Sequence, residues 1–311
     1  VQTCALPIYG ALHAVIKMAP DALDQAAASD KRRKGGHAIG PLDGVPIMFK
    51  DNIDTAGLVT TAGSYALAEN VAAKDSEAAR RLRAAGVVIL GKANLSQWAG
   101  LRTTKGFNGS TTGGSPHNPY DLTRTPAGSS SGPGIVAATS MAAGAVGSDT
   151  TGSIIGPSNV NGIVGLRPTT GLVSRTGVVP ISSTLDTTGP MTRTVKDAAM
   201  MLTVMAGTDP SDAATGEADA HKIDYGNSLA ADALKGKRIG VVRGLTGYSE
   251  ETQPVFDAAI GILKAQGAEL VEVSADIFTD LGWELRVIEA YYFKPELAIY
   301  LKNAPPQVKS S

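Results

Sequence analysis

Short apolar runs alternate along the chain with patterns typical of helices. The run VPIMFK predicts a buried strand at 45–50, entered through the turn PLDG, and VVILG predicts a second strand at 87–91. Between them, Asp75 is expected to cap a helix through SEAARRLRAA, with Gly86 at its C-terminal end. The first third of the chain therefore reads as strand, helix, strand.

The same alternation continues to the end of the sequence. A helix is expected at about 133–143, followed by a strand, AVGSD, at 145–149. Helical spacing of apolar residues then predicts a late helix with one buried face, made of Phe256, Ala259, Ile260 and Leu263. The segment AELVEV follows as a strand, and 280–303 reads as one long amphipathic helix. This order predicts an α/β fold with a largely parallel or mixed sheet.

The composition of the chain limits the classes of molecule that we expect it to bind. The 311 residues carry 28 Lys and Arg against 29 Asp and Glu, a net charge of -1, and the basic run DKRRK at 30–34 is short. Nucleic acid is therefore an unexpected partner. No apolar run reaches the roughly 18 residues that span a bilayer. Because Cys4 is the one cysteine, neither an internal disulfide nor a cysteine-rich metal site can form. The motifs H-E-x-x-H and G-x-x-x-x-G-K-[ST] are absent from the sequence, so we expect neither metal nor cofactor.

The N-terminal stretch VQTCALPI, residues 1–8, resembles the translation of a sequencing adapter and is expected to be non-native. Residues 9–311 are then expected to be a single domain, because the polar stretch 205–234 reads as a surface excursion rather than a linker. The compartment stays open, with the cytoplasm as the default and secretion as an alternative.

One serine-rich stretch matches a nucleophile pattern. Residues Gly128 to Gly132, GSSSG, fit G-x-S-x-G with Ser130 in the central position. That motif needs a strand directly before it and a histidine after it. The preceding residues are typical of a loop, and only His221 follows, so we disfavour Ser130 as the nucleophile.

A serine can also be activated by a lysine whose pKa is lowered by burial. Lys50 ends an apolar strand, and Ser153 follows a turn, DTTG, whose backbone N–H groups could converge as in an oxyanion hole. From these features alone we favour the simpler interpretation, in which Lys50 is a solvated lysine at a strand end and Ser153 caps a helix. The catalytic interpretation stays open as the alternative.

Four segments together resemble the amidase signature family over about residues 40–300. They are GVPIMFKDNID with Lys50, GSSSGPGIVAA, GSDTTGSIIGPSNVNGIVGLRPTTGLVSRTGVVP and DTTGPMTRTVKDAA, and GKANLSQWA is closest to the peptide amidase branch. The resemblance implies a mixed sheet covered by helices on both faces. It also implies that the domain is incomplete at its C-terminus, because members of the family continue well past residue 311.

The resemblance also implies a Ser-Ser-Lys triad. Ser153 matches the nucleophile, Lys50 the base, and Ser129 a relay serine that follows Gly128 through a cis peptide bond. The implied oxyanion hole uses the backbone N–H groups of Thr150, Thr151, Gly152 and Ser153. Ser130 and Asp149 are expected to support the site by hydrogen bonding.

The chain departs from the family pattern at two positions within these motifs. Thr151 stands where a glycine is usual in the family, and the peptide amidase branch also has a residue other than glycine there. Pro133 stands where a small residue is usual. Proline is tolerated in the first turn of a helix, so we expect no disruption there.

The implied reaction is hydrolysis of a carboxylic or C-terminal peptide amide to the acid and ammonia through an acyl-enzyme. The expected partner is a small-molecule or peptide amide substrate, and the sequence does not indicate the oligomeric state. Two alternatives stay open, an amidase subunit of glutamyl-tRNA amidotransferase and a non-catalytic fragment.

Overall fold

The chain divides into two compact units. The computed structural model describes residues 10–101, 108–245, 250–275 and 282–309, so the stretch 1–8 lies outside the described residues. The first unit is Val1–Gly226 with Ile288–Ser311, and the second is Asn227–Val287. A single domain over 9–311 stays a prediction, and each unit is described by itself.

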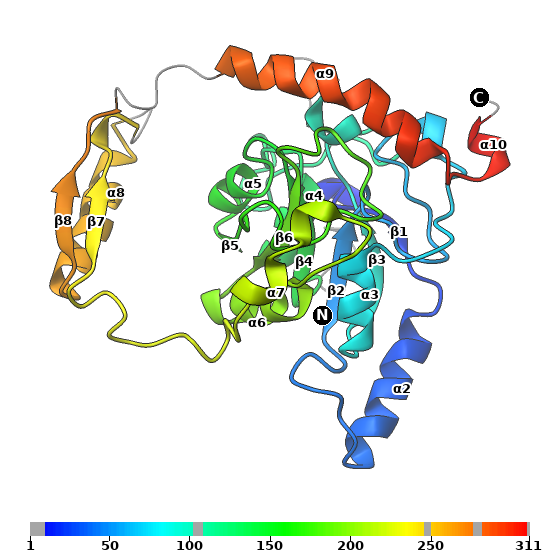
Figure 1. Cartoon of the computed structure of the whole chain (residues 1–311), viewed down its shortest axis with the longest axis horizontal. Coiled ribbons are helices and arrows are strands. Elements are labelled where there is room, and N and C mark those ends of the chain that lie inside the picture. Colours follow the sequence, from blue (N-terminus) through cyan, green and yellow to red (C-terminus); the bar gives the residue numbers. More distant parts are fainter. Residues whose placement is uncertain (1–9, 102–107, 246–249, 276–281, 310–311) are drawn as a thin grey trace. The chain divides into compact units, whose positions relative to one another are not determined.

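A six-stranded mixed sheet forms the centre of the first unit, in the strand order β1-β3-β2-β4-β6-β5 (Figure 1). Strand β2 pairs in parallel with both β3 and β4, whereas β1, β6 and β5 run antiparallel to their neighbours. The strands are β1 (Val15–Met18), β2 (Pro46–Lys50), β3 (Val88–Ala93), β4 (Gly144–Asp149), β5 (Val164–Gly165) and β6 (Thr187–Thr192). The helices are α2 (Ala22–Lys34), α3 (Glu77–Ala84), α4 (Ser131–Ala138), α5 (Ile155–Val160), α6 (Val195–Met205), α7 (Ala218–His221) and α10 (Pro306–Lys309).

Helices cover the sheet on both faces, as predicted. Successive side chains of a strand point to opposite faces, so Phe49 and Met48 of β2 enter different cores. Phe49 packs with residues of α3 and α6, such as Leu82 and Met201, whereas Met48 packs with Ile135 of α4. Because both faces of β2 are covered, its side chains from Ile47 onward are fully buried.

The expected strands at 45–50, 87–91 and 145–149 are all present as β2, β3 and β4. The cap of α3 differs from the prediction. The hydroxyl of Ser76, not the carboxylate of Asp75, accepts the Ala79 N–H at the start of this helix. Asp75 instead forms an ion pair with Arg83, 2.7 Å from Nε to Oδ2, and accepts the Ala56 N–H. Asp75 therefore joins a loop to the helix rather than capping it.

Two further helices match their predictions with shifted ends. The helix expected at 133–143 is α4, which begins at Ser131 and ends at Ala138. The long helix expected at 280–303 is α9 (Gly282–Leu301), and it contains Pro295. Proline within the first turn of α4 is accommodated as expected.

The second unit contains a β–α–β arrangement. Strands β7 (Arg238–Val241) and β8 (Glu269–Glu272) pair in parallel, joined through α8 (Gln253–Ala265). On the predicted apolar face of α8, Phe256, Ile260 and Leu263 are half-buried, and Ala259 is exposed. None of the residues of α8 is fully buried within the described structure.

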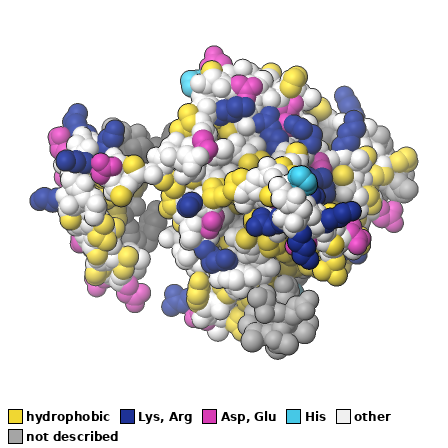
Figure 2. Space-filling model, turned by 90° about the horizontal axis from the view of Figure 1, so that it is seen from below, with side chains coloured by type: hydrophobic (Ala, Val, Ile, Leu, Met, Phe, Trp, Pro, Cys, Tyr) yellow, Lys and Arg dark blue, Asp and Glu magenta, His cyan; other side chains and the backbone are white. Residues whose placement is uncertain are grey.

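Charged side chains of both signs are exposed on the face of the protein shown in Figure 2. The basic run that the sequence contains at 30–34 forms the last turn of α2. One of its members, Arg32, forms an ion pair with the buried carboxylate of Asp43. In the part of the chain that the structure describes, every helix is too short or too polar to cross a bilayer.

Replacing Gly132 in α4 by alanine is expected to destabilise the first unit by several kcal/mol. An added Cβ at this position would lie 2.5 Å from both Ala14 O and Asn94 O, which are backbone atoms that cannot rotate away. Overpacking of this kind typically costs about 1–3 kcal/mol or more. Denaturant unfolding followed by circular dichroism measures the effect.

Gly156→Ala is the matched control, because Gly156 lies in α5 and its nearest neighbours would be 3.9 and 4.0 Å from the new Cβ. Its stability should be unchanged or raised by up to about 1 kcal/mol, the helix propensity difference. Equal stabilities for the two variants would contradict the close packing of α4 against β3.

Candidate active site

A buried lysine lies at the carboxyl end of β2, next to β4. Lys50 is fully buried, and its Nζ donates hydrogen bonds to Ser129 Oγ at 2.8 Å and to Ser148 Oγ and O at 2.9 and 3.1 Å. The strand delivers the amine to this point because Lys50 is its last residue. Ser148, which the sequence reasoning passed over, lies on the neighbouring strand β4 and also accepts from Asn52 Nδ2 at 2.9 Å.

Burial changes the chemistry of this amine. Removal from water disfavours the charged form and lowers the pKa of Lys50 to about 7, although the negative charges of Asp149 and Asp186 act in the opposite direction. Near neutral pH a substantial fraction of Lys50 is therefore uncharged, and an uncharged amine can accept a proton. The interpretation of Lys50 as a solvated lysine at a strand end is wrong.

Ser129 and Ser130 link the lysine to the loop that follows β4. The peptide bond between Gly128 and Ser129 is cis. Ser130 donates its N–H to Ser153 O at 3.2 Å and its hydroxyl to Ser148 O at 3.0 Å. Lys50, Ser129 and Ser153 therefore lie in one region of the protein. The hydrogen bond from Ser130 N–H to Ser153 O directly joins the serine-rich segment to the loop after β4.

Asp149 organises the loop at 150–154, which we name the catalytic loop after the role that we propose for it. Its carboxylate accepts the N–H groups of Gly152 at 2.7 Å and Ile154 at 2.6 Å. The carboxylate is itself fully buried and forms an ion pair with Arg167, 3.1 Å from Nε to Oδ1. The loop therefore folds back around the last residue of β4.

Two further carboxylates hold the threonines of the catalytic loop. The Thr150 hydroxyl donates to Asp186 Oδ1 at 2.6 Å, and the Thr151 hydroxyl donates to Glu289 Oε1 of α9 at 2.8 Å. Sequence reasoning missed both acids. Asp186 had a signal, because it directly precedes a strand in the family-like motif DTTGPM, whereas Glu289 lies on a helix with no such motif.

One contact that the expected relay would use is absent from this geometry, and so are the groups that two disfavoured mechanisms would need. Among the hydrogen bonds of the described residues, none joins the hydroxyls of Ser129 and Ser153. His221, which a G-x-S-x-G mechanism would need, lies exposed in α7 beside Glu217. Likewise, within the described ranges no group of His, Cys, Asp and Glu could hold a metal ion.

A second buried lysine lies one strand away. Lys92 of β3 is fully buried, and its Nζ donates to Ile53 O at 2.5 Å and to Thr60 Oγ1 at 2.9 Å. Asp51, the neighbour of Lys50, lies 3.8 Å from this amine. Burial lowers the pKa of Lys92 and raises that of Asp51. These contacts fix the loop that directly follows Lys50.

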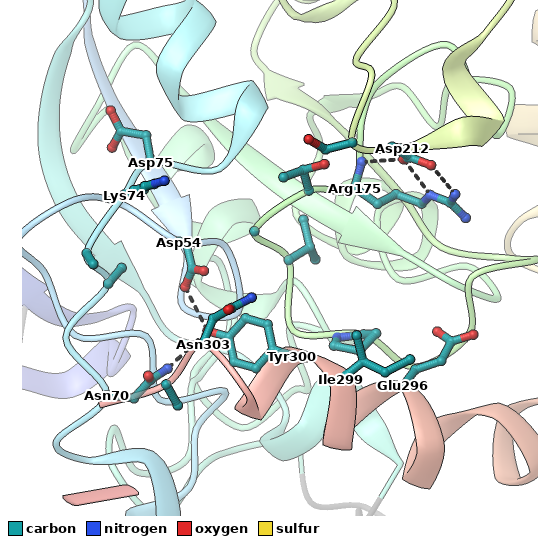
Figure 3. Close-up of a pocket in the computed structure, with 18 of the residues that line it drawn as sticks. Asp54, Asn70, Lys74, Asp75, Arg175, Asp212, Glu296, Ile299, Tyr300 and Asn303 are labelled. Carbon is teal, nitrogen blue, oxygen red and sulfur yellow. Dashed lines mark hydrogen bonds and ion pairs between the residues drawn. The ribbon is translucent and has the colours of Figure 1, made fainter. Parts of the chain in front are cut away.

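A cavity of about 870 Å³ in the first unit extends to Asp186 but is not lined by Lys50, Ser129 or Ser153. Figure 3 shows its polar wall, where Arg175 pairs with Asp212 and the Tyr300 hydroxyl donates to Asp54 at 2.8 Å. Burial beside Asp54 raises the pKa of Tyr300. The cavity thus reaches the catalytic loop through the carboxylate that holds Thr150.

Helix α9 supplies one side of this region through Phe293, Glu296 and Tyr300. The Phe293 ring meets Trp98 edge to face, with ring centroids 5.8 Å apart, and Glu296 Oε1 accepts the Ser183 N–H at 3.0 Å. Glu289, on the same face of α9, contacts the catalytic loop. Residues along this face of the helix therefore contact several loops of the first unit, which α9 crosses in Figure 1.

Fold and site together define an α/β protein with a buried lysine–serine pair beside the central parallel strands of a mixed sheet. The model of the Amidase family matches residues 9–299, and the chain belongs to this family. The predicted family and the predicted fold class are confirmed.

Solved structures and curated relatives that resemble this chain support the same family. The chain is 42% identical to a peptide amidase from Stenotrophomonas maltophilia, with a TM-score of 0.88 over 95% of this chain and 61% of that one. A peptide amidase in complex with the competitive inhibitor chymostatin gives a TM-score of 0.89 at 42% identity, over 94% of this chain and 61% of that one. A glutamyl-tRNA(Gln) amidotransferase subunit from Salinispora arenicola is 43% identical over 261 residues, 83% of this chain and 52% of the relative. The chain spans about half the length of the curated relatives it matches.

Proposed function

We propose that this protein is an amidase that hydrolyses a linear carboxylic amide or a C-terminal peptide amide to the acid and ammonia. The observation that carries the proposal is the fully buried Lys50, hydrogen-bonded to Ser129 in a member of the Amidase family. Similarity to peptide amidases, one of them bound to a competitive inhibitor, supports a small-molecule or peptide amide as the substrate class.

The proposed chemistry begins with an uncharged Lys50. Its amine accepts the Ser129 proton while Ser129 takes the proton of Ser153, whose oxygen forms a bond to the amide carbon. The carbon–nitrogen bond then breaks as the proton returns through Ser129 to the leaving nitrogen, which departs as ammonia. Water, activated by the same relay, attacks the acyl-enzyme and releases the acid with Ser153 restored.

The negative oxygen of the tetrahedral intermediate is assigned to backbone N–H groups of the catalytic loop. These are the N–H groups of Thr150, Thr151, Gly152 and Ser153. Because the Gly152 N–H also donates to Asp149, its main contribution is to hold the turn that directs the other three. One donor of this kind is worth about 3–4 kcal/mol at the transition state of comparable acyl transfers.

Ammonia release is the direct test. The purified chain is incubated with a peptide amide and with a simple carboxamide, and ammonia is measured with a coupled dehydrogenase assay. We expect time-dependent ammonia from at least one of these substrates and the matching acid in equal amount. Folded protein that releases no ammonia from any linear amide would contradict the proposal and favour a non-catalytic fragment.

A second candidate is an amidase subunit of a glutamyl-tRNA amidotransferase, supported by the relative from Salinispora arenicola. The two candidates differ in what they require. Ammonia release from glutamine that depends on an added partner protein would favour the amidotransferase. Release from a peptide amide by the chain alone would favour the peptide amidase.

A further inference from the structure

Asp186 lies at the end of the pairing between β4 and β6. Asp149 pairs with Thr187 in this ladder, so Asp186 stands one residue beyond it, beside Thr150 at the start of the catalytic loop. The sheet itself therefore sets the position of the Asp186 backbone relative to this loop.

The Asp186 carboxylate is almost fully buried and accepts three hydrogen bonds. Oδ1 accepts the Thr150 hydroxyl, and Oδ2 accepts the N–H groups of Ile181 at 2.8 Å and Ser182 at 3.0 Å. The residue is 7% exposed, and it is one of the residues that line the cavity. Three donors from two segments fix the carboxylate, and through it they fix Thr150.

The charged groups around this carboxylate belong to the same region. Its negative charge acts on Lys50 of β2 and on Arg175, and Glu296 of α9 acts on it in turn. Arg167 donates to the neighbouring Leu185 O at 2.8 Å. The negative charges that act on Lys50 are those of Asp149, already paired with Arg167, and Asp186.

Asp186 is largely ionised at pH 7, near the midpoint of the Lys50 titration. Burial raises the pKa of Asp186 to about 6, whereas the pKa of Lys50 is about 7. A negative charge near an amine stabilises the protonated form, so removing it should make Lys50 lose its proton at lower pH.

We propose that Asp186 is a positioning residue of the site, which holds Thr150 of the catalytic loop and places a negative charge toward Lys50. The role in catalysis rests on the proposed amidase function, whereas the effect on Lys50 can be measured without turnover. Asp186 touches neither the reacting serine nor the base, and it acts through Thr150 and through its charge.

Two variants separate these contributions. Asp186→Asn removes the charge at every pH, whereas Thr150→Val removes the hydrogen bond and keeps the carboxylate, which is ionised above its own pKa. Protein labelled with ¹³C at lysine Cε is titrated by NMR, with the Lys50 signal assigned from its loss in Lys50→Arg. We expect the midpoint of Lys50 to fall by about 0.5–1 pH unit in Asp186→Asn and by less in Thr150→Val, where the carboxylate remains but its pKa rises without the Thr150 donor.

The activity of the same variants completes the test. Thr150→Val should lower kcat about tenfold with a smaller shift of the Lys50 midpoint than Asp186→Asn, because the loop is loosened while the carboxylate remains. An unshifted Lys50 midpoint in folded Asp186→Asn would overturn the proposal, and so would wild-type kcat in Thr150→Val. If Asp186→Asn does not fold, Asp186→Ser removes the same charge with a smaller side chain and is titrated instead. Absence of turnover in the wild type would contradict the amidase function, and the Lys50 titration would still decide the effect of Asp186.

Discussion

Ser153→Ala is expected to abolish ammonia release from amide substrates. Without the Ser153 hydroxyl no acyl-enzyme can form, and neither Lys50 nor Ser129 has another oxygen to activate at the end of the catalytic loop. Removal of the catalytic serine in a well-studied serine hydrolase lowers kcat by a factor on the order of 10⁶. The measurement is the initial rate of ammonia release at saturating peptide amide, compared with wild type at the same protein concentration.

Ser115→Ala is the control for this loss, because Ser115 is exposed and lies outside the site. It should keep the wild-type rate. The rate of Ser129→Ala should lie between those of Ser153→Ala and Ser115→Ala. Ser153 is still present in this variant, but its proton can no longer pass through Ser129 to Lys50. A Ser153→Ala protein that retains wild-type turnover would remove Ser153 from the mechanism and reopen the question of the nucleophile.

The second large effect is expected below neutral pH, where the rate of amide hydrolysis should fall about tenfold per pH unit. Lys50 acts as a base only when uncharged, and burial places its pKa at about 7. Above this pH the Lys50 amine is mostly uncharged. Below it the amine is mostly protonated and cannot accept a proton from Ser129. A profile of kcat/KM from pH 5 to 9 measures this limb.

Lys50→Met removes the base and should reduce activity at every pH by several orders of magnitude. Lys34→Met serves as the matched control, because Lys34 is exposed at the end of α2, and it should leave both the rate and the acid limb unchanged. A flat profile between pH 5 and 9 in the wild type would exclude a lysine base with a pKa near 7.

Local patterns were sufficient to predict the elements that carry the site. The apolar run before Lys50 predicted β2, and the small-residue run after the serines predicted α4. Spacing alone could not place Lys50 beside Ser129, because 79 residues separate them and only the sheet order joins them. The prediction of their contact depended on the resemblance to a family.

The residues that sequence reasoning missed act across long separations. Thr150 meets Asp186 36 residues later, and Thr151 meets Glu289 138 residues later. Neither acid stands at a spacing that periodicity can interpret, because hydrogen bonds between loops and distant elements depend on the finished packing. The prediction that Asp75 caps α3 was wrong for a more local reason. Asp75 and Ser76 are adjacent, and both are favourable cap residues.

The central pairing of β2 with β4 has a consequence for how the protein folds. Lys50 and Ser148 are 98 residues apart, so their contact forms only after a long loop has closed, and such non-local contacts slow folding. Before that closure Lys50 is exposed to water and carries an ordinary lysine charge at neutral pH. The environment that lowers the pKa of Lys50 therefore exists only once the sheet has closed around it.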